Sequence, residues 1–505
     1  MAKSNSKERK EESKALPVST SKKTATQLRN ARKRRSKQKT KPQQSPTTTS
    51  GQASDPSVQY LHNPKLAPLV QTAKQFFADI YAVQFPIYQK GPKTGWRTVS
   101  KLPVRTQQGK VSIGMFQKQS HRINTPSGSS CSFYAYPAHH PSINQALVSV
   151  AQLCQELNID VYNEHDGSGF LRYVAMNVEQ ATGKVQLTLI WKDSPYQQEL
   201  EIGKKKKKKK KRKKNDNTPS KTSSSEGKIQ LERLISHLLH KMAPSQEEKD
   251  KSSSWQLHSL WVHFNAAWKH SNAIFDIHST SPDAWLHVYG PKTIPEHLTL
   301  SSSTLTVAKK PTLHFGPNVF RQANLGAFAH IVDAIRQRIG QERNNEMQCV
   351  ELYGGVGTIG LNLLDLPNIK SLVCSDENTH NQDCFAKGLA SLESSSAKAT
   401  YVPLNATDMV KDSRRFLQDM CHVLIVDPPR KGLDEPVVEA LISSSHKIQL
   451  LVYVSCGFEA FQRDYKSLTD KEQWKLEHAE GHILFPGSNA IETLAFFTHK
   501  SSKKR

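Results

Sequence analysis

Apolar residues in the C-terminal part of the chain recur in short runs that alternate with stretches of helical spacing. Residues 325–339 and most intervals between the runs have the spacing of an amphipathic helix. A strand–helix alternation of this kind is typical of a parallel sheet with helices on both faces. It predicts a doubly wound α/β domain over 311–500, with a hairpin at the sheet edge between 475–485 and the last run. The strand-like runs lie at 349–353, 371–375, 400–404, 422–426, 449–454 and 493–498.

The preceding part of the chain has a mixed pattern. Residues 64–82 and 143–156 have helical spacing, whereas 112–116 and 185–191 alternate or run apolar as strands do. No single period continues through this region. We therefore predict a mixed α/β domain over 57–310.

Two segments lack apolar periodicity and carry most of the charge. Residues 1–56 are rich in Lys, Ser, Thr and Gln, and residues 203–227 contain an unbroken basic run from Lys204 to Lys214. Both are predicted to be disordered. The second interrupts the N-terminal domain, because strand and helix patterns resume at Ile229.

The net charge of +25 is concentrated in these two segments. The first 50 residues hold 15 Lys and Arg against three Glu, and the run of eleven basic residues after Gly203 supplies nearly all the rest. Such blocks remain solvated and often contact nucleic acid. A solubilising tail, or a nuclear or nucleolar signal at Arg32–Arg35, is an equal alternative.

The cysteines and the apolar runs limit the class of protein. Seven cysteines are scattered without a Cys-x-x-Cys pair, so neither a disulfide framework nor a zinc site is indicated. No run of 18 apolar residues predicts a transmembrane helix, and the N-terminus lacks the apolar region of a secretory signal. We expect an intracellular protein without a metal, in the nucleus, nucleolus or cytoplasm, or in an organelle.

Residues suited to a nucleotide-type ligand follow two of the predicted strands, where an α/β enzyme binds ligands outside the carboxyl edge of its sheet. The first run leads into a turn with Gly354, Gly355 and Gly357, and Asp376 follows the next run about 20 residues later. Glycine lets the backbone approach a ligand closely, and the acid can accept hydrogen bonds from ribose hydroxyls. The spacing Gly-Gly-x-Gly-Thr favours a methyl-donor site over a dinucleotide site.

Two further strand ends carry Asp427 and Cys456. The two prolines after Asp427 stop the strand, and Arg430 follows them. Cys456 lies between Ser455 and Gly457, where a turn can expose its sulfur. Arg430 or the next helix N-terminus would lower the thiol pKa, as a nucleophile requires. The structural alternatives are an Asp427 side chain that caps its loop and a Cys456 thiol in the core.

Two more segments contain polar candidates. Gln322 and Asn324 precede the helix predicted over 325–339. Asn324 suits an N-cap, and Gln322 can point at a ligand. Glu492 is the only acid in the stretch 485–494. Taken alone, its local sequence predicts an ordinary surface glutamate.

Together, five segments resemble the RNA uracil-5-methyltransferase family, whose members form 5-methyluridine in tRNA and rRNA. The resemblance is strong over 311–498 and weaker within 96–174. It implies a Rossmann-like class I methyltransferase domain at the C-terminus, after a mixed α/β substrate domain. The segments are Phe-Arg-Gln-Ala-Asn at 320–324, Glu-Leu-Tyr-Gly-Gly-Val-Gly-Thr at 351–358, Asp-Pro-Pro-Arg-Lys-Gly-Leu at 427–433, Tyr-Val-Ser-Cys at 453–456, and Phe-Pro with Ile-Glu within 485–492.

The resemblance also implies roles for single residues. Cys456 would add to C6 of the target uracil, and Glu492 would remove the C5 proton after methylation, so that the cysteine is released. Arg430 would lie near the uracil. The residues that would bind S-adenosylmethionine are Gln322, Tyr353, Gly355, Gly357, Asp376 and Asp427.

The chain departs from the family pattern at several points. Gly457 stands where the family commonly has Asn, and Ala490 stands where it commonly has His. The four-cysteine motif of some members is absent, so we expect no iron–sulfur cluster. No small β-barrel RNA-binding module is evident before Trp96. The basic tail and lysine run could supply RNA contacts instead, since phosphate contacts give affinity without sequence preference.

Two alternative functions follow from the same residues. A cytosine-5 RNA methyltransferase also uses a cysteine, but a second cysteine would be expected where Arg430 stands. A catalytically inactive RNA-binding or assembly factor could retain the fold. The presence of Cys456, Asp427 and Glu492 argues against it.

Overall fold

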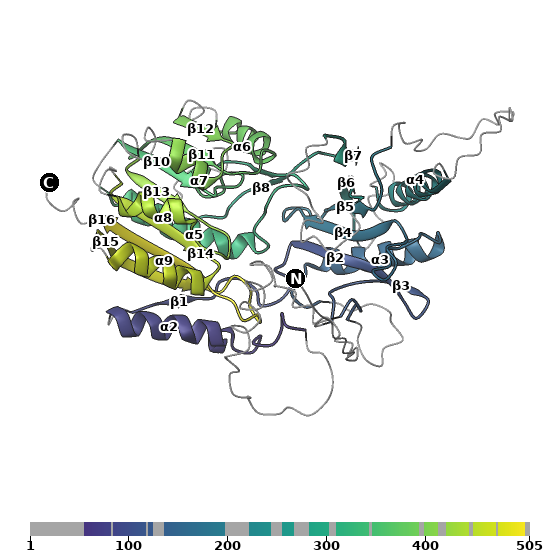
Figure 1. Ribbon diagram of the computed structural model, residues 1–505, viewed down its shortest axis with the longest axis horizontal. Helices are drawn as coiled ribbons and strands as arrows, with labels where there is room; N and C mark the ends of the chain where they lie inside the picture. The colour runs from purple at the N-terminus through teal and green to yellow at the C-terminus, as the bar shows by residue number, and fades with distance from the viewer. Residues whose placement is uncertain are drawn as a thin grey trace, which may run out of the picture. The chain divides into compact units, whose positions relative to one another are not determined.

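A computed structural model of the chain contains two large β-sheets (Figure 1). The basic residues Arg32–Arg35 and Lys204–Lys214, which the sequence places in disordered segments, lie outside the described part. The described residues are 55–81, 84–117, 120–124, 136–196, 222–243, 255–266, 282–301, 310–342, 346–392, 398–412, 421–443, 448–470 and 473–499.

The first sheet has eight strands and forms the predicted doubly wound α/β domain. Strand β16 runs antiparallel to both of its neighbours, whereas the other pairs are parallel. This arrangement confirms the fold class predicted for the C-terminal region. In spatial order the strands are β1 (Ile87–Tyr88), β15 (Trp474–His482), β16 (Glu492–His499), β14 (Leu450–Ser455), β13 (Val423–Val426), β10 (Met347–Leu352), β11 (Ile369–Ser375) and β12 (Ala399–Val402).

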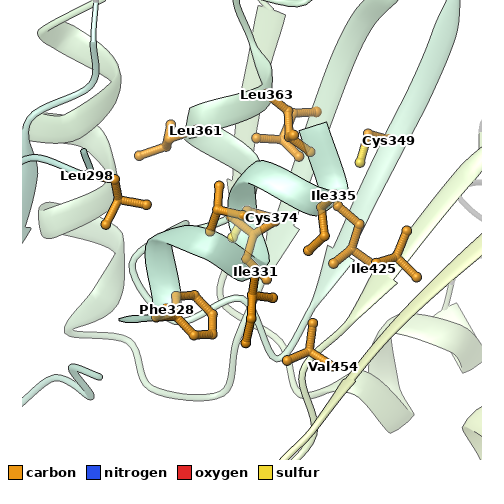
Figure 2. Packing of buried hydrophobic residues seen from close by; sticks show 14 of the residues in the cluster. Leu298, Phe328, Ile331, Ile335, Cys349, Leu361, Leu363, Cys374, Ile425 and Val454 are labelled. Atoms are coloured by element: carbon orange, nitrogen blue, oxygen red, sulfur yellow. The ribbon is translucent and has the colours of Figure 1, made fainter. Parts of the chain in front are cut away.

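Helices cover both faces of this sheet. Helices α5 (Leu325–Gly340) and α6 (Asn381–Ala390) pack on one face with the short 3-10 helix η4 (Gly360–Leu363). In Figure 2, Phe328, Ile331 and Ile335 of α5 lie beside Ile425 and Val454 from the strands. The opposite face holds α2 (Pro68–Tyr81), α7 (Ala406–Asp412), α8 (Glu435–Ile442) and α9 (Phe458–Asp470).

The segment that starts with the 3-10 helix η1 (Pro64–Leu66) belongs to this sheet, although the sequence assigned it to the domain over 57–310. Helix α2 buries Val70, Ala73 and Phe77 against the sheet. Strand β1 pairs with β15, so that the predicted β15–β16 hairpin forms but does not lie at the edge. No local pattern could reveal this, because the partners lie about 390 residues apart in sequence.

The second sheet has six strands and one helical layer. Helices α3 (Pro141–Glu156) and α4 (Thr222–Met242) share its apolar core. Two short strands, β8 (Ile294–Glu296) and β9 (Leu313–Phe315), form a separate ribbon. The six strands, in order, are β3 (Lys110–Ile113), β2 (Val99–Gln107), β4 (Leu171–Val178), β5 (Val185–Trp191), β6 (Leu257–Phe264) and β7 (Trp285–Tyr289), the last preceded by the 3-10 helix η2 (Pro282–Ala284).

Helix α4 begins inside the insertion predicted over 203–227. Its first residues, from Thr222, are Ser- and Thr-rich and resemble low-complexity sequence, although such residues are also common where helices begin. The buried positions that mark the helix, such as Leu231 and Leu234, come only after Ile229. Within the described residues, every helix is too short or too polar to cross a membrane.

Hydrogen bonds connect the second sheet to the segment before α5. The backbone N–H of Thr98, just before β2, donates to the carbonyl of Ala323 at 2.9 Å. Arg321 donates to the carbonyl of Val178 at the end of β4 at 2.8 Å and forms a buried ion pair with Glu296 of β8 at 2.5 Å. These contacts hold residues 321–323 against both β2 and β4.

Candidate functional site

Four parallel strands of the eight-stranded sheet end at one edge. Leu352 of β10 lies in register with Ser375 of β11 and with Val426 of β13, and Val426 pairs with Tyr453 of β14. The residues that follow these strand ends therefore gather at the carboxyl edge of the sheet, as expected for an α/β enzyme. They include four of the predicted site residues, namely Tyr353, Asp376, Asp427 and Cys456.

The glycine-rich turn after β10 combines tight packing with an open position. Tyr353, Gly355 and Gly357 all have positive φ, of 58°, 55° and 79°. A Cβ added to Gly354 would lie 2.5 Å from Sγ of Cys374, so only glycine fits there. A Cβ added to Gly355 would meet no atom within 4 Å. The turn thus leaves accessible space over Gly355, where a ligand can approach the backbone.

Asp376 is fixed beside this turn by three hydrogen bonds. One carboxylate oxygen accepts from the backbone N–H of Gly355 at 3.1 Å. The other accepts from the backbone N–H of Asn378 at 2.9 Å and from Nδ2 of Asn381 at 3.0 Å. Burial raises the pKa of Asp376, whereas the hydrogen bonds from Asn378 and Gly355 oppose that rise. The carboxyl group is held rigidly at the open side of the turn.

Glu351, which the sequence did not single out, lies beneath the same turn. It is buried in β10, and Oε2 accepts from the backbone N–H of Gly360 at 3.1 Å. Burial raises its pKa to about 8. A Cβ on Gly360 would lie 2.4 Å from this oxygen. Glu351 therefore supports the turn from the core side.

Asp427 does not cap its loop. Within the described residues no donor forms a hydrogen bond with its carboxylate, which rules out the structural alternative considered for this residue. Burial raises its pKa to about 7. An acid without a hydrogen-bonded partner at the edge of the sheet is available to a ligand.

Cys456, the first residue after β14, and Glu492, the first residue of β16, lie at adjoining ends of two neighbouring strands. The register pairs Ser455 of β14 with Thr493 of β16, and its continuation by one residue places Glu492 opposite Cys456. Directly opposed residues of an antiparallel pair have Cβ atoms about 4.5–5.5 Å apart on the same face. Glu492 is buried, in contrast to the surface position that its local sequence suggests, and Cys456 is half-buried.

The electrostatics of this pair differ from expectation in one respect. Burial raises the pKa of Cys456 to about 11, and the negative charges of Glu492 and Asp427 act in the same direction. Arg430 lowers this pKa as predicted, but its effect is smaller. The prediction of a lowered pKa is therefore wrong for the free protein. The pKa of Glu492 is also raised well above its ordinary value, mainly by burial and to a smaller extent by the negative charge of Asp427.

The contribution of Arg430 can be measured through thiol reactivity. Arg430→Gln should slow alkylation of Cys456 by iodoacetamide roughly 3- to 10-fold near pH 8, because the thiolate fraction changes about tenfold per unit of pKa. Mass spectrometry of the labelled peptide would give the rate. Lys431→Gln is the matched control, since Lys431 already pairs with Asp434 at 2.6 Å. Equal rates in both variants would contradict the assigned influence of Arg430.

The turn between Cys456 and α9 packs directly on the Asp-Pro-Pro-Arg loop. A Cβ on Gly457 would lie 2.5 Å from the backbone oxygen of Arg430. Glycine at this position therefore brings Cys456 and Arg430 close together. The helix that follows begins at Phe458, so Cys456 precedes a helix N-terminus, as predicted.

Gly457→Ala should destabilise the protein by roughly 1–3 kcal/mol, because the added methyl group meets backbone that can only shift. Urea denaturation would measure this difference. Gly326→Ala is the control: a Cβ there meets nothing within 4 Å, and the site lies in the first turn of α5. The control should be neutral or slightly stabilising. An unchanged midpoint for Gly457→Ala would show that the contact is absent.

The segment before α5 contains Gln322 and Asn324. Asn324 is the N-cap of α5, since Oδ1 accepts from the backbone N–H of Ala327 at 3.2 Å, which confirms the capping role. Its Nδ2 donates to the carbonyl of Leu484 at 2.8 Å. Gln322 is half-buried, two residues from the cap. Within the ranges described above, no three His, Cys, Asp or Glu side chains are arranged to hold a metal ion.

Comparisons with known proteins agree with this architecture, although no family model matches the chain. An uncharacterised RNA methyltransferase of Protochlamydia amoebophila is 30% identical over 413 residues, which cover 82% of this chain and 88% of the relative. Another, from Lactobacillus johnsonii, is 23% identical over 407 residues, with coverage of 80% and 72%.

One solved structure shares the fold over most of the chain. The tRNA (uracil-54, C5)-methyltransferase of Pyrococcus abyssi, in complex with S-adenosyl-L-homocysteine, superposes with a TM-score of 0.52 at 17% identity. The match covers 85% of this chain and 83% of that one. With the sequence identity to the Protochlamydia protein across most of both chains, these findings show that the chain belongs to the RNA methyltransferase family that its motifs resemble.

Proposed function

We propose that this protein methylates C5 of a uridine in tRNA or rRNA, with S-adenosylmethionine as the methyl donor. The observation that carries the proposal is the placement of Cys456 opposite buried Glu492, at the same sheet edge as the glycine-rich turn and Asp376. A thiol and a carboxyl group on either side of one position suit addition to C6 and proton removal at C5. The Pyrococcus enzyme named above, which shares this fold, acts on C5 of uracil.

The turn and its neighbours have the features required to hold the cofactor. The open space over Gly355 permits close approach of a ligand to the backbone, and Asp376 is fixed beside it. Asp427 offers a carboxyl group without a hydrogen-bonded partner within the described residues. When bound, S-adenosylmethionine supplies an electrophilic methyl group. The residues proposed to hold it are Gln322, Tyr353, Gly355, Gly357, Asp376 and Asp427.

The proposed chemistry assigns separate tasks to the thiol and the carboxylate. The Cys456 thiolate forms a bond from Sγ to C6 of the uracil, which makes C5 nucleophilic enough to acquire the methyl group. Glu492 then accepts the C5 proton, the C5=C6 double bond forms again, and the C6–S bond breaks to release the thiolate. Covalent addition divides one difficult reaction into easier steps.

Both groups must lose a proton before they can act. In the free protein a pKa of about 11 keeps the Cys456 thiol protonated near neutral pH, and burial raises the pKa of Glu492 well above its ordinary value. Arg430 is the cation that favours the ionised form of both. Binding of substrate and cofactor must therefore shift these equilibria, a common property of sites that are assembled on binding.

Positive charge near the site suits the RNA backbone. Arg97 lies just before β2. Its pKa is lowered mainly by burial and, to a smaller extent, by repulsion from the positive charge of Arg430. Across the described ranges, neither guanidinium group pairs with a carboxylate. Two guanidinium groups that form no ion pair with a carboxylate in the described part of the chain can neutralise phosphates.

The test is methylation of defined RNA. The purified protein would be incubated with S-adenosylmethionine and with unmodified tRNA or rRNA, followed by digestion and mass spectrometry of nucleosides. We expect 5-methyluridine, and the RNA that gains it identifies the substrate class. Formation of 5-methylcytidine would overturn the base assignment. Cofactor binding without methylation of either RNA would favour an RNA-binding factor.

A further inference from the structure

A row of polar side chains continues from Glu492 into the neighbouring strand. His482 of β15 lies in register with Glu492 of β16, which itself lies opposite Cys456. Opposed residues of antiparallel strands share a face. The register thus places Glu492 beside His482, and its continuation by one residue beyond β14 places Cys456 on the other side of Glu492.

Contacts around His482 confirm which face this row occupies. Leu494 and Phe496 alternate with Glu492 along β16 and are buried in the cluster that contains α5. The ring of His478 stacks on Phe496 with centroids 6.1 Å apart. The pKa of His330 of α5 is lowered mainly by burial, and His482 is among the charged groups that affect it. All these side chains lie on the α5 face of the sheet.

Hydrogen bonds extend the row to the protein surface. Nε2 of His482 bonds Oε1 of Glu480 at 2.8 Å, and Oε2 of Glu480 bonds Nε2 of His478 at 3.1 Å. Glu492 and His482 are each 4% exposed, whereas the side chain of His478 is 46% exposed. Although burial opposes it, the two histidines hold the pKa of Glu480 at about 2, so this carboxylate stays ionised.

We propose that His482 is the proton acceptor for Glu492 and that Glu480 and His478 connect it to water. This inference rests on the proposed function. Before each reaction Glu492 must become a carboxylate. Its proton moves to Nδ1 of His482, whose Nε2–H faces Glu480, and the resulting imidazolium is stabilised by that carboxylate. The proton then passes across Glu480 to His478 and into solvent. His482 touches no reacting atom and acts by setting the protonation state of Glu492.

Other charged groups also face His482. His330 and Asp333 of α5 lie on the same side, and Lys90 follows β1 close to His330. The ring of Tyr88 lies 5.5 Å from that of His482. Within the described residues, Glu480 is the group that forms a hydrogen bond with the His482 side chain.

The variant His482→Gln tests the proposal with full-length protein, tRNA or rRNA that the wild type methylates, and S-adenosylmethionine. Turnover should fall roughly 10- to 100-fold near neutral pH, less than the about 10²–10⁴-fold contributed by a general acid or base itself, with little change in KM for RNA. Protein–RNA adduct methylated at C5 should accumulate, because protonated Glu492 cannot accept the C5 proton. Raising the pH should restore turnover, since Glu492 then ionises directly.

His330→Gln is the matched control, because it makes the same change next to His482 outside the hydrogen-bonded chain. It should turn over as the wild type does and accumulate no adduct. If His482→Gln fails to fold, Glu480→Gln provides a second test. Loss of the negative charge beside His482 should shift the acid limb of the pH profile of this variant. The methylated adduct should also accumulate.

The outcomes separate this inference from the proposed function. Adduct in Glu492→Gln but wild-type turnover and pH dependence in both His482→Gln and Glu480→Gln would overturn the role of His482 and leave the reaction intact. A wild type that forms no 5-methyluridine, together with a Glu492→Gln variant that forms no adduct, would overturn the reaction itself. A fall in turnover without adduct or a shifted pH profile would reduce His482 to a structural role.

Discussion

Cys456→Ala is expected to lower formation of 5-methyluridine by roughly 10⁴-fold or more, the scale seen when a nucleophile is deleted. Without the sulfur no bond to C6 can form, and C5 of an unactivated uracil is too weak a nucleophile to take a methyl group. Mass spectrometry of digested RNA, with the wild-type protein in parallel, measures the effect. The covalent adduct should also disappear.

Cys384→Ala is the matched control for this loss. Cys384 lies in α6, is also a free cysteine and is buried in the apolar core that contains α5. Its replacement should cost about 1 kcal/mol of stability and leave methylation close to that of the wild type. The Cys456→Ala variant should still bind the cofactor, as measured by calorimetry. Substantial 5-methyluridine from Cys456→Ala would eliminate the adduct mechanism.

Glu492→Gln should produce the opposite change in the covalent species. Addition of Cys456 and acquisition of the methyl group precede proton removal, so the variant should stop at the methylated adduct. Turnover is expected to fall about 10²–10⁴-fold. Denaturing gel electrophoresis would detect protein that migrates with RNA, and the double variant Cys456→Ala with Glu492→Gln should show none. A Glu492→Gln variant that turns over normally would assign the base to another group.

The same substitution has a consequence for stability. The pKa of Glu492 is higher in the folded protein than its ordinary value of 4.5. The folded state therefore holds this proton more tightly than the unfolded state, and the contribution of Glu492 to wild-type stability falls as the pH rises above about 4.5. Glutamine does not ionise, so the variant should lose less stability over that range. Urea denaturation at a series of pH values compares the two proteins.

Local sequence predicted the strand ends well, for a physical reason. The glycine, proline or acidic residues that end a strand lie within a few residues of its apolar run, so the end can be recognised locally. Parallel strands bring such ends to a common edge of the sheet. Asp376, Asp427 and Cys456 could therefore be placed together from sequence. Asn324 as an N-cap is equally local, because the cap bonds a backbone N–H three residues later.

Properties that depend on distant partners could not be predicted in this way. The pKa of Cys456 reflects burial and two acids on other strands, whose sum exceeds the nearby effect of Arg430. The local sequence suggested a surface position for Glu492, because the burial of this residue depends on two neighbouring strands. His482 carried no signal in its own segment, since only the β15–β16 register aligns it with Glu492.

The position of β1 has a consequence for the order in which the chain folds. Residues 64–88 are synthesised long before β15, the strand that β1 extends. The apolar side of α2, with Phe77 at its centre, must therefore wait for its partners while more than 380 residues are added. Contacts so distant in sequence slow folding. We expect the nascent chain to depend on chaperones that shield this segment until the last hairpin is complete.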